Sequence, residues 1–458
     1  MPPMPEPKKT VIFSIEIAAR ELVPKCLLAL ECAKAGMRVY IGSFRALKQL
    51  EGKVDGCIFF HKSTWNKNAA RLRKTIGAHF VFLDEEMGPS LPKSELTNYL
   101  TNRYSAVSAV NYEHTFAIGD VHKSSMEALG NFRGVKVHAL GWPRLDLWRE
   151  TFHQLYTSET ERIRKENGEF YLLISSFGAI SESNYHEAVK SHAEHYNQDS
   201  SRIDYNYNNF KSCIKLIHEL SPKLDENENI IVRPHTSESI DEWEKHVRDL
   251  PKVYIQHKGD VSPWLLASEG TIQFGSTVGI QAVCMGIPSI QYHDNIERPG
   301  ITDTLPFELL DSTTSANGIL NFLRDSKDKR TKDLKKSAID RLDGIVSCLD
   351  GPLASTHIAK VLNEIDVPPQ PPIRFNLPRR FILWFKEQIN YLNYLKSSKL
   401  LKREQTRIKR SKFEKIPNGL KADDIGRTIR EIAKCLGDDP SRIKCRQAAH
   451  NLVEIEFD

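Results

Sequence analysis

The chain of 458 residues lacks the features that mark several common protein classes. Its eight cysteines form no CxxC pair and no zinc or iron–sulfur spacing, so they are expected to be reduced thiols in a cytoplasmic protein. No stretch approaches the roughly 20 apolar residues that span a bilayer. The first apolar run is short and strand-like, unlike the core of a signal peptide. These absences predict a cytoplasmic protein without a metal site.

The charge balance excludes little by itself. The formal net charge is +5, with 40% hydrophobic and 27% charged residues, which is ordinary for a soluble globular protein. A mildly basic chain does not indicate nucleic acid, and an anionic substrate or an anionic membrane surface fits equally well. The length suggests two or three domains. We therefore predict no nucleic-acid partner and look to the motifs for function.

Short apolar runs alternate with helical patterns along most of the chain. Strands are predicted at 10–17, 37–42, 56–60, 79–83, 105–110 and 135–140, and again at 169–178, 229–234, 253–256, 270–275 and 287–292. This alternation predicts parallel βαβ units. The fold class is therefore α/β, with two Rossmann-like doubly wound domains at 1–165 and 166–365 whose strand ends face a shared cleft. The polar stretch 180–204 is either a loop or a helical insertion.

The composition changes after about residue 366. A proline-rich linker is followed by a basic and aromatic stretch, 379–415, and then by a small helical appendix from about 420. We treat 366–458 as a basic helical C-terminal extension. The stretch 379–415 could lie on an anionic inner membrane surface, which would make the protein peripheral there. Alternatively, its first part packs back onto the first domain.

An acidic cluster ends one of the predicted strands. In "FVFLDEEMGPSLP" (80–92) an apolar run stops at three consecutive carboxylates, Asp84, Glu85 and Glu86. One carboxylate raises the pKa of its neighbour, as general acid–base catalysis requires. The structural alternative is a solvated acidic turn.

Two further motifs follow strands of the second half. In "IIVRPHTSE" (230–238), Arg233 can bind a phosphate in a fork and His235 can donate to it. In "IQFGSTVGIQAVCMGIPSI" (272–290), Gly275, Ser276 and Thr277 precede a predicted helix whose N-terminus is an anion site. This is neither a Walker A nor a GxGxxG loop, so no nucleoside triphosphatase and no dinucleotide cofactor are predicted. The alternatives are a carboxylate-paired arginine, a surface histidine and a plain Ser/Thr cap.

Weaker signals lie elsewhere. Arg144 in "LGWPRLDLW" (140–148) could face the cleft, although a structural role is favoured. Glu16 and Arg20, after the first strand, could pair with each other or contact a sugar. Trp264 is a packing residue or a base-stacking platform, and packing is favoured.

In combination these motifs resemble those of the metal-independent GT-B transferases, which include bacterial sialyltransferases and Kdo transferases. More closely, the chain looks like the bacterial surface carbohydrate biosynthesis protein family. The matching pieces run in the family's order over roughly residues 10–295: "EIAARELVPKCLLALECAKAGMRVYIG", "LDEEMG", "GWPRLDL", "LLISSFG", "RPHTSE", "VSPWL" and "GSTVGIQAVCMGIPSI". The tail piece "RSKFEKIPNGL" also has a family look. The chain departs from the family at Met87, where a second glycine is usual, and at Thr236, where proline is usual.

The resemblance implies roles for the motif residues. One carboxylate, Glu85 with Asp84 and Glu86 as alternatives, would be the base on the acceptor hydroxyl, and His235 would contact the leaving phosphate. The remaining implied residues are donor-binding Arg233, Ser276, Thr277, Gly275 and Gly178, and acceptor-side Glu16, Arg20 and Arg144. No metal is implied. A covalent retaining route would need a second carboxylate as nucleophile, for which Asp146 and Asp260 are candidates.

The resemblance also implies an activity in which 1–165 binds the acceptor and 166–365 the donor. A glycosyltransferase of bacterial capsule, O-antigen or lipopolysaccharide biosynthesis would transfer Kdo or a related acidic sugar to a glycan or lipid-linked glycan acceptor. Its donor substrate would be a CMP-sugar, and it would need no cofactor. Two alternatives stay open: a CDP-alcohol-dependent polyol-phosphate transferase of the teichoic type, with a sugar-nucleotide 2-epimerase as a more distant option, and a non-catalytic scaffold subunit of a polysaccharide assembly complex.

Overall fold

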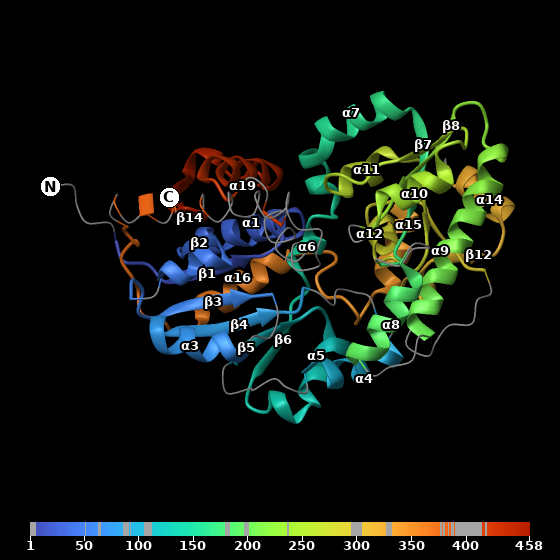
Figure 1. Cartoon of the computed structure of the whole chain (residues 1–458). Helices are drawn as coiled ribbons and strands as arrows, with labels where there is room; N and C mark the ends of the chain where they lie inside the picture. Colours follow the sequence, from blue (N-terminus) through green and yellow to red (C-terminus); the bar gives the residue numbers. More distant parts are fainter. Residues whose placement is uncertain are drawn as a thin grey trace. The chain divides into compact units, whose positions relative to one another are not determined.

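The computed structural model divides the chain into two compact units, each built around its own sheet (Figure 1). The first unit comprises Met1–Met87, Tyr99–Leu147 and Gly344–Asp458, and the second comprises Gly88–Asn98 and Trp148–Asp343. The structure describes residues 6–50, 52–62, 66–85, 91, 93–104, 112–178, 184–196, 201–235, 238–294, 305–326, 332–375, 378, 381, 382, 384, 385, 389, 415, 416 and 419–458.

The first unit holds an eight-stranded sheet in the order β13-β14-β2-β1-β3-β4-β5-β6. Six strands pair in parallel: β1 (Thr10–Ile15), β2 (Arg38–Ser43), β3 (Cys57–His61), β4 (Ala78–Leu83), β5 (Tyr112–Ala117) and β6 (Lys136–Ala139). The last two, β13 (Ile443–Ala449) and β14 (Leu452–Phe457), form a hairpin that adds antiparallel to β2. β1 and β2 are buried along their whole length, as expected for central strands with both faces covered.

Helices cover this sheet. They are α1 (Ala18–Lys34), α2 (Phe44–Leu47), α3 (Asn66–Ile76), α5 (Asp120–Glu127), α6 (Pro143–Asp146), α16 (Ala354–Glu364) and α19 (Ala422–Leu436), with 3₁₀ turns at Lys48–Leu50, Gly130–Phe132 and Pro440–Arg442. α4 (Lys93–Tyr104) is divided: its residues as far as Asn98 group with the second unit and those from Tyr99 with the first. α1 packs against α16 and α19, which both come from the C-terminal part of the chain. α19 begins with Asp423 and Asp424 and ends at Gly437 in the left-handed conformation, the usual signals of helix start and stop.

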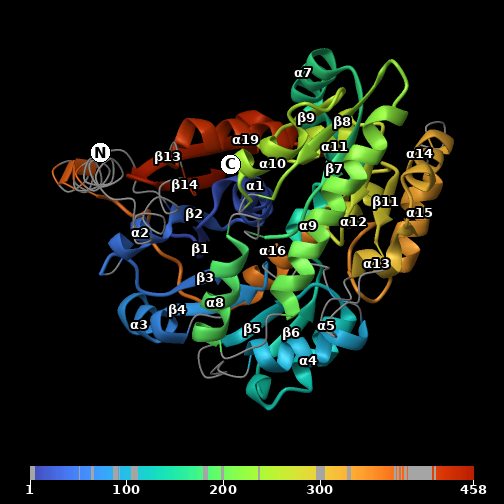
Figure 2. The same ribbon diagram turned by 45° about the vertical axis from the view of Figure 1, so that its right-hand side comes forward.

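The second unit holds a six-stranded, all-parallel sheet in the order β12-β11-β10-β7-β8-β9. Figure 2 labels β7, β8, β9 and β11 of this sheet. The strands are β7 (Glu169–Ile174), β8 (Glu228–Arg233), β9 (Val253–Ile255), β10 (Gly270–Gln273), β11 (Ser289–Tyr292) and β12 (Asp311–Thr313). The chain moves outward from β7 to β9, then returns to β10 on the other side. This reversal is the switch point at which doubly wound sheets bind ligands.

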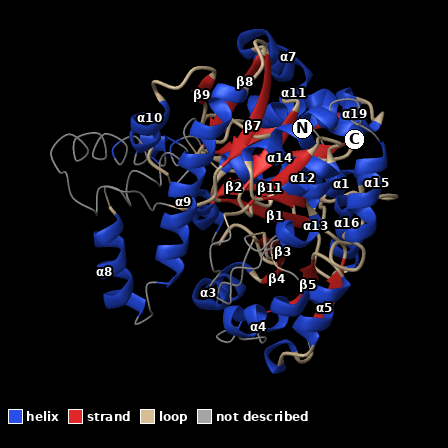
Figure 3. Cartoon of the chain, turned by 90° about the vertical axis from the view of Figure 1, so that its right-hand side faces the viewer, coloured by secondary structure: helices blue, strands red, loops and turns tan. Residues whose placement is uncertain are grey.

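Helices lie on both faces of the second sheet. They are α7 (Thr157–Asn167), α8 (Tyr185–Tyr196), α9 (Ser201–Leu220), α10 (Ile240–Val247), α11 (Ser262–Ala267), α12 (Val278–Cys284), α13 (Leu305–Leu309), α14 (Ala316–Asp325) and α15 (Lys332–Arg341), with 3₁₀ turns at Glu150–Tyr156 and Ser221–Lys223. Phe210 of α9 and Trp243 of α10 join Leu173 and Val232 in the core on one face. α11 packs on α7 and α12 on α15. Figure 3 shows α8 beside α9, so 185–196 is helical insertion and not loop.

The two parallel sheets confirm the predicted α/β class with two Rossmann-like doubly wound units. The predicted ranges 1–165, 166–365 and 366–458 differ from the observed units, because 148–165 groups with the second unit and 344–458 with the first. The helical appendix is present as α19, but β13 and β14 were not predicted. The strand predicted at 105–110 lies outside the described residues, and β5 was missed. Among the helices that the structure describes, none has the length and apolarity needed to span a membrane.

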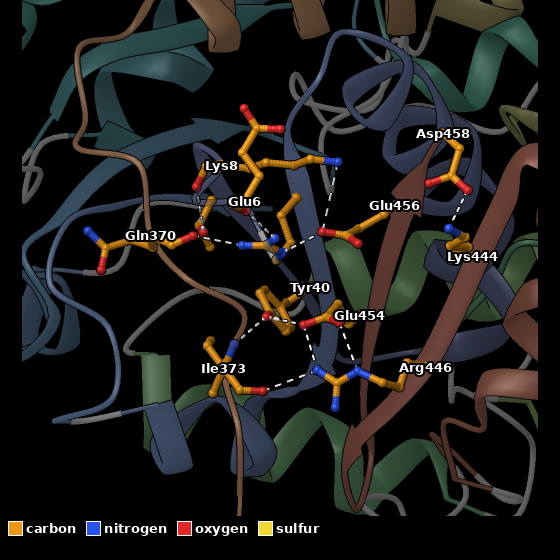
Figure 4. A network of polar contacts seen from close by, with 12 residues as sticks. Glu6, Lys8, Tyr40, Gln370, Ile373, Lys444, Arg446, Glu454, Glu456 and Asp458 are labelled. Carbon is orange, nitrogen blue, oxygen red and sulfur yellow. Dashed lines mark hydrogen bonds and ion pairs between the residues drawn. The ribbon is translucent and has the colours of Figure 1, made fainter. Parts of the chain in front are cut away.

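A buried arginine explains how the C-terminal part is held to the first sheet. The Arg38 side chain on β2 is 1% exposed and donates to Glu456 Oε1 of β14 at 2.6 Å. It also donates to the carbonyl of Gln370 at 2.7 Å, in the network shown in Figure 4. Gln370 in turn bridges Lys8 in antiparallel fashion. One guanidinium therefore ties the chain's start, its proline-rich segment and its last strand together.

A second set of contacts lies beside it. Tyr40 Oη donates to the Glu454 carboxylate and accepts from the backbone N–H of Ile373 at 2.9 Å (Figure 4). Arg446 donates to both oxygens of Glu454, at 2.8 and 2.7 Å, and to the carbonyl of Ile373 at 3.1 Å. These contacts therefore hold the proline-rich linker against the first unit at Gln370 and Ile373.

Candidate functional site

The carboxyl ends of three neighbouring strands in the first unit carry charged residues. β1, β3 and β4 are adjacent in the sheet, and Glu16, Lys62 and Asp84 follow them directly. Carboxyl ends of parallel strands are where such sheets bind ligands. We call this set, with Glu85, the acidic edge.

Asp84 is held as a buried ion pair. Its side chain is 1% exposed and accepts from Arg103 Nη2 at 2.8 Å, from Arg103 Nε, and from Tyr104 Oη at 2.7 Å. Burial raises the pKa of Tyr104, and the charge of Asp84 adds to that rise. These contacts are those of a structural carboxylate that holds Arg103 and Tyr104 in place. The role of Asp84 as a base stays a prediction.

A buried histidine lies near this pair. His122 on α5 is 2% exposed, and its Nδ1 accepts from the backbone N–H of Ile118 at 3.4 Å. Burial lowers the pKa of His122 to about 4, with the nearby charge of Asp84 acting in the opposite direction. His122 is therefore neutral near pH 7.

Glu85 is paired with a lysine from α1. Both of its carboxylate oxygens accept from Lys25 Nζ, at 2.8 and 2.9 Å, and the Lys25 residue is 1% exposed. Its backbone N–H donates to the carbonyl of Lys62 at 3.1 Å, which fixes the turn after β4 against the end of β3. Glu86, the third predicted carboxylate, lies outside the described residues, as do Met87 and Thr236.

Glu16 is the partner of two lysines. Lys62 Nζ lies 2.7 Å from Glu16 Oε2 and 3.1 Å from Glu21 Oε1, and Lys415 also donates to Glu16. Burial alone would raise the pKa of Glu16, but the hydrogen bonds from Lys415 and Lys62 lower it to about 2. Arg20 lies 3.7 Å from Glu21. The acidic edge is thus an alternating array of carboxylates and ammonium groups.

Arg144 and the two candidate nucleophiles, Asp146 and Asp260, make contacts that stabilise the fold. The Arg144 guanidinium stacks over the Trp142 ring at 5.5 Å. Asp146 is fully buried and accepts from the backbone N–H groups of Ala354 and Ser355, at 2.9 and 2.8 Å, and from Ser355 Oγ at 2.7 Å. Asp146 therefore caps the first turn of α16, which argues against it as a nucleophile. Asp260, the other candidate, accepts from the backbone N–H of Ser262 at the start of α11.

In the second unit three predicted motifs come to neighbouring strand ends. β8, β7 and β10 are adjacent in the sheet, and they lead into 233–235, 175–178 and 274–277 respectively. The backbone N–H of His235 donates to Ser175 Oγ at 3.2 Å, while the His235 residue is exposed. We call these three loops the donor edge.

Arg233 contacts its own unit's backbone. Nη1 donates to the carbonyl of Lys258 at 3.0 Å and Nη2 to that of Gly259 at 2.8 Å, and the guanidinium lies 5.2 Å from the Trp264 ring centroid. Burial lowers the pKa of Arg233 to about 10. Two of its donors therefore hold the loop after β9, and its predicted phosphate contact stays a prediction. Trp264 packs at 6% exposure, as favoured.

Glu238 joins two loops of the donor edge. Its carboxylate accepts from Ser175 Oγ at 2.5 Å, from the backbone N–H of Phe177 at 2.8 Å and from Trp243 Nε1 at 3.0 Å. Burial raises the pKa of Glu238, while these hydrogen bonds oppose the rise. Because Ser175 also accepts from His235, Glu238 fixes the backbone that carries His235.

The Gly-Ser-Thr turn is fixed from the neighbouring strand. The backbone N–H of Gly275 donates to Gln291 Oε1 of β11 at 2.8 Å, and Gly275 has φ +80°, a conformation that favours glycine. Ser276 is 8% exposed and its Oγ accepts from the backbone N–H of Val278 at 3.3 Å. Thr277 is the residue before α12 and makes no side-chain cap. Gly178 ends the Ser175 loop with φ +71°.

Four residues that contact the candidate site residues were missed by reasoning from the sequence: Lys25, Lys62, Glu238 and Gln291. Lys25 carries a signal, since it is a lone charge inside the apolar run "LVPKCLLAL". Glu238 stands in the quoted motif "RPHTSE", but nothing local shows that it turns back to Ser175. The contacts of Lys62 with Glu16 and of Gln291 with Gly275 can be predicted only when the strand order is known.

The fold of this chain is similar to that of several solved structures, at low sequence identity. No family model and no curated protein matches the chain. The wall teichoic acid polymerase TagF aligns with 78% of this chain and 89% of its own at 11% identity, TM-score 0.46. S. aureus MnaA with UDP aligns over 78% and 98% at 13% identity, TM-score 0.43. Anabaena Alr3699/HepE in complex with UDP-glucose aligns over 78% and 100% at 10% identity, TM-score 0.41.

Proposed function

We propose that the chain is a GT-B glycosyltransferase of bacterial surface polysaccharide biosynthesis. It transfers Kdo or a related acidic sugar from a CMP-activated donor to a glycan or lipid-linked glycan acceptor, without a metal, in the cytoplasm. The observation that carries the proposal is the donor edge. Three motifs far apart in the sequence meet at the carboxyl ends of β8, β7 and β10, next to the reversal in strand order.

In this proposal the donor edge handles the leaving phosphate. His235 donates a hydrogen bond or a proton to the departing CMP, and the hydroxyls of Ser276 and Thr277 bind its phosphate oxygens. Arg233 acts mainly by holding the loop at Lys258–Gly259 in place. Glu238 is a positioning residue, because its carboxylate accepts from Ser175 Oγ, which in turn accepts from the backbone N–H of His235.

The acidic edge supplies the base. Glu85 accepts the proton of the acceptor hydroxyl as its oxygen bonds to the anomeric carbon and the bond to the CMP oxygen breaks. Lys25 holds the Glu85 carboxylate in place through hydrogen bonds to both of its oxygens. Glu16, Arg20 and Arg144 are retained as acceptor-side residues.

A second candidate follows from the same ion pairs. Asp84 is held by Arg103 and Glu85 by Lys25, so neither carboxylate is an uncompensated base. A CDP-alcohol-dependent polyol-phosphate transferase attacks at phosphorus and needs no carboxylate at an anomeric carbon. Its chemistry would use His235 and the Ser276–Thr277 turn alone.

A thermal-shift panel separates the two. CMP, CDP, UDP, GDP and ADP are tested with and without magnesium on the wild type and on His235→Ala, because a ligand of the native state raises its melting temperature by mass action. The matched control is His218→Ala, since His218 is an exposed histidine on α9 that contacts only a backbone carbonyl in the described part of the chain. Magnesium-independent stabilisation by CMP, lost in His235→Ala and kept in His218→Ala, supports the first candidate.

The other outcomes are equally informative. Stabilisation by CDP in preference to CMP supports the polyol-phosphate transferase. No response of the wild type to any of the five nucleotides contradicts both candidates and favours a scaffold role.

A further inference from the structure

Five of the exposed large apolar side chains fall within nine residues of the first unit. In the described part of the chain, six large hydrophobic residues are exposed. One is Tyr254, and the other five, which are 41–62% exposed, are Phe381, Ile382, Trp384, Phe385 and Ile389. All five are helical. We call these five the apolar face. A cluster of this kind on an otherwise well-packed protein marks an interaction surface.

The apolar face has the geometry of one side of a helix. Phe381, Phe385 and Ile389 follow one another at intervals of four residues, which places them in a row. The Phe381 and Phe385 rings stack at 6.2 Å, and Phe381 lies 5.7 Å from Trp384. The aromatic rings therefore contact one another while remaining open to solvent.

The sequence around this face has a net positive charge larger than that of the whole chain. Residues 379–415 contain twelve Lys and Arg but three Asp and Glu, a net charge of +9. The whole chain has a net charge of +5, so everything outside this stretch sums to −4. Aromatic and aliphatic side chains beside such a charge excess fit an anionic lipid surface, where each cation near the surface adds about 1 kcal/mol. A second copy of this chain offers no such match, since the rest of this chain is only weakly acidic.

Both ends of this stretch are fastened to the first unit. On one side Ile373 is bonded to Tyr40 and Arg446. On the other, the carbonyl of Lys415 accepts from the backbone N–H of Ala18 at 2.8 Å, and its ammonium group donates to Glu16 of the acidic edge. The C-terminal end of the stretch therefore lies against the loop after β1.

We infer that the apolar face inserts into the interface of an anionic lipid bilayer and carries the acidic edge to that surface. This places the first unit next to membrane-borne substrates. The inference rests on the exposed side chains and the charge distribution, and it holds whichever sugar or polyol phosphate is transferred.

Vesicle co-flotation of the full chain tests the inference. The wild type is mixed with vesicles of phosphatidylcholine alone or of a phosphatidylcholine–phosphatidylglycerol mixture, at low and high salt. The test variant replaces Phe381, Trp384 and Phe385 by serine. The matched control is Tyr254→Ser, which removes an aromatic residue of similar exposure from the second unit. Melting temperatures of both variants verify that these exposed positions leave the fold intact.

The inference predicts binding to the phosphatidylglycerol vesicles that falls at least about tenfold in the triple variant and in high salt, and is unchanged in Tyr254→Ser. Equal binding of the wild type and the triple variant overturns it, as does the absence of wild-type binding. Binding that is as strong to phosphatidylcholine alone overturns the electrostatic part. A wild-type dimer that the triple variant converts to a monomer, without vesicle binding, shows instead that the face joins two copies of this chain.

Discussion

Replacing Asp146 by alanine should destabilise the first unit without affecting nucleotide binding. The carboxylate is fully buried and is the acceptor for three donors, two backbone N–H groups at the start of α16 and Ser355 Oγ. Alanine leaves all three without this acceptor. Because α16 packs on both α1 and α6, the lost cap loosens the segment that returns the chain to the first unit.

The magnitude follows from the number of donors. A buried donor left without its acceptor costs about 1–3 kcal/mol, and water entering the space of the deleted carboxylate recovers part of this. We expect Asp146→Ala to lower the free energy of unfolding by about 3–5 kcal/mol. Asp260→Ala is the matched control, since Asp260 is exposed and accepts from one backbone N–H, that of Ser262 at the start of α11, and about 0.5–1 kcal/mol is expected there.

Urea unfolding followed by tryptophan fluorescence measures both variants. Trp142 and Trp148 are buried on either side of Asp146 in the sequence, so their emission reports on this region. Nucleotide stabilisation, measured on the fraction that remains folded, should match that of the wild type. A cost below about 1 kcal/mol together with loss of the nucleotide response would refute the capping role and return Asp146 to consideration as a nucleophile.

Two further predictions concern the same unit. Burial lowers the pKa of His122 to about 4, so the unfolded chain binds more protons than the folded one between about pH 6.5 and pH 4. The free energy of unfolding therefore falls, by up to about 3 kcal/mol, as the pH falls through this window. His122→Leu should flatten that part of the pH profile in urea titrations. An unchanged slope in the variant would show that other groups cause it. Gly141 has φ +78°, and a Cβ there would lie 2.4 Å from the carbonyl oxygen of Ser347, so Gly141→Ala should cost at least about 2 kcal/mol. Gly134→Ala, with φ +87° and open space around the new methyl, should cost about 1 kcal/mol by the same assay, and equal costs would contradict the steric argument.

Local pattern was sufficient for the central strands. "TVIFSI" and "EFYLLI" are mostly apolar because their strands are covered on both faces, and both were predicted to start at the residue where they start, with ends placed two and four residues too late. β5, "YEHTFA", was missed because its first half is polar: Glu113 is exposed and His114 half-buried. β13 and β14 were missed for a different reason. β14 pairs with β2, some 400 residues earlier in the chain, and β13 joins the sheet through its hairpin with β14. The long-range pairing leaves no local pattern in the sequence.

The site shows the same division. The order of motifs along the chain led correctly to strand ends, because a doubly wound sheet places every such loop at one edge. The partners of the motif residues depend on which strands are neighbours. Lys25 reaches Glu85 from α1, and Glu238 reaches Ser175 across β7 and β8, so both pairs required the three-dimensional arrangement. The sequence alone identified candidate chemistry, and the ion pairs show which carboxylates are compensated.

Release of CMP from CMP-Kdo by the purified protein tests the central claim most directly. The account predicts slow, magnesium-independent hydrolysis in the absence of acceptor, reduced at least about tenfold in His235→Ala because a donor to the leaving phosphate is lost, and unaffected in His218→Ala. Glu85→Gln should retain CMP binding, since its carboxylate acts on the acceptor side. No CMP release by the wild type, together with turnover of a CDP-alcohol that depends on His235, would contradict sugar transfer and establish the polyol-phosphate reaction in its place.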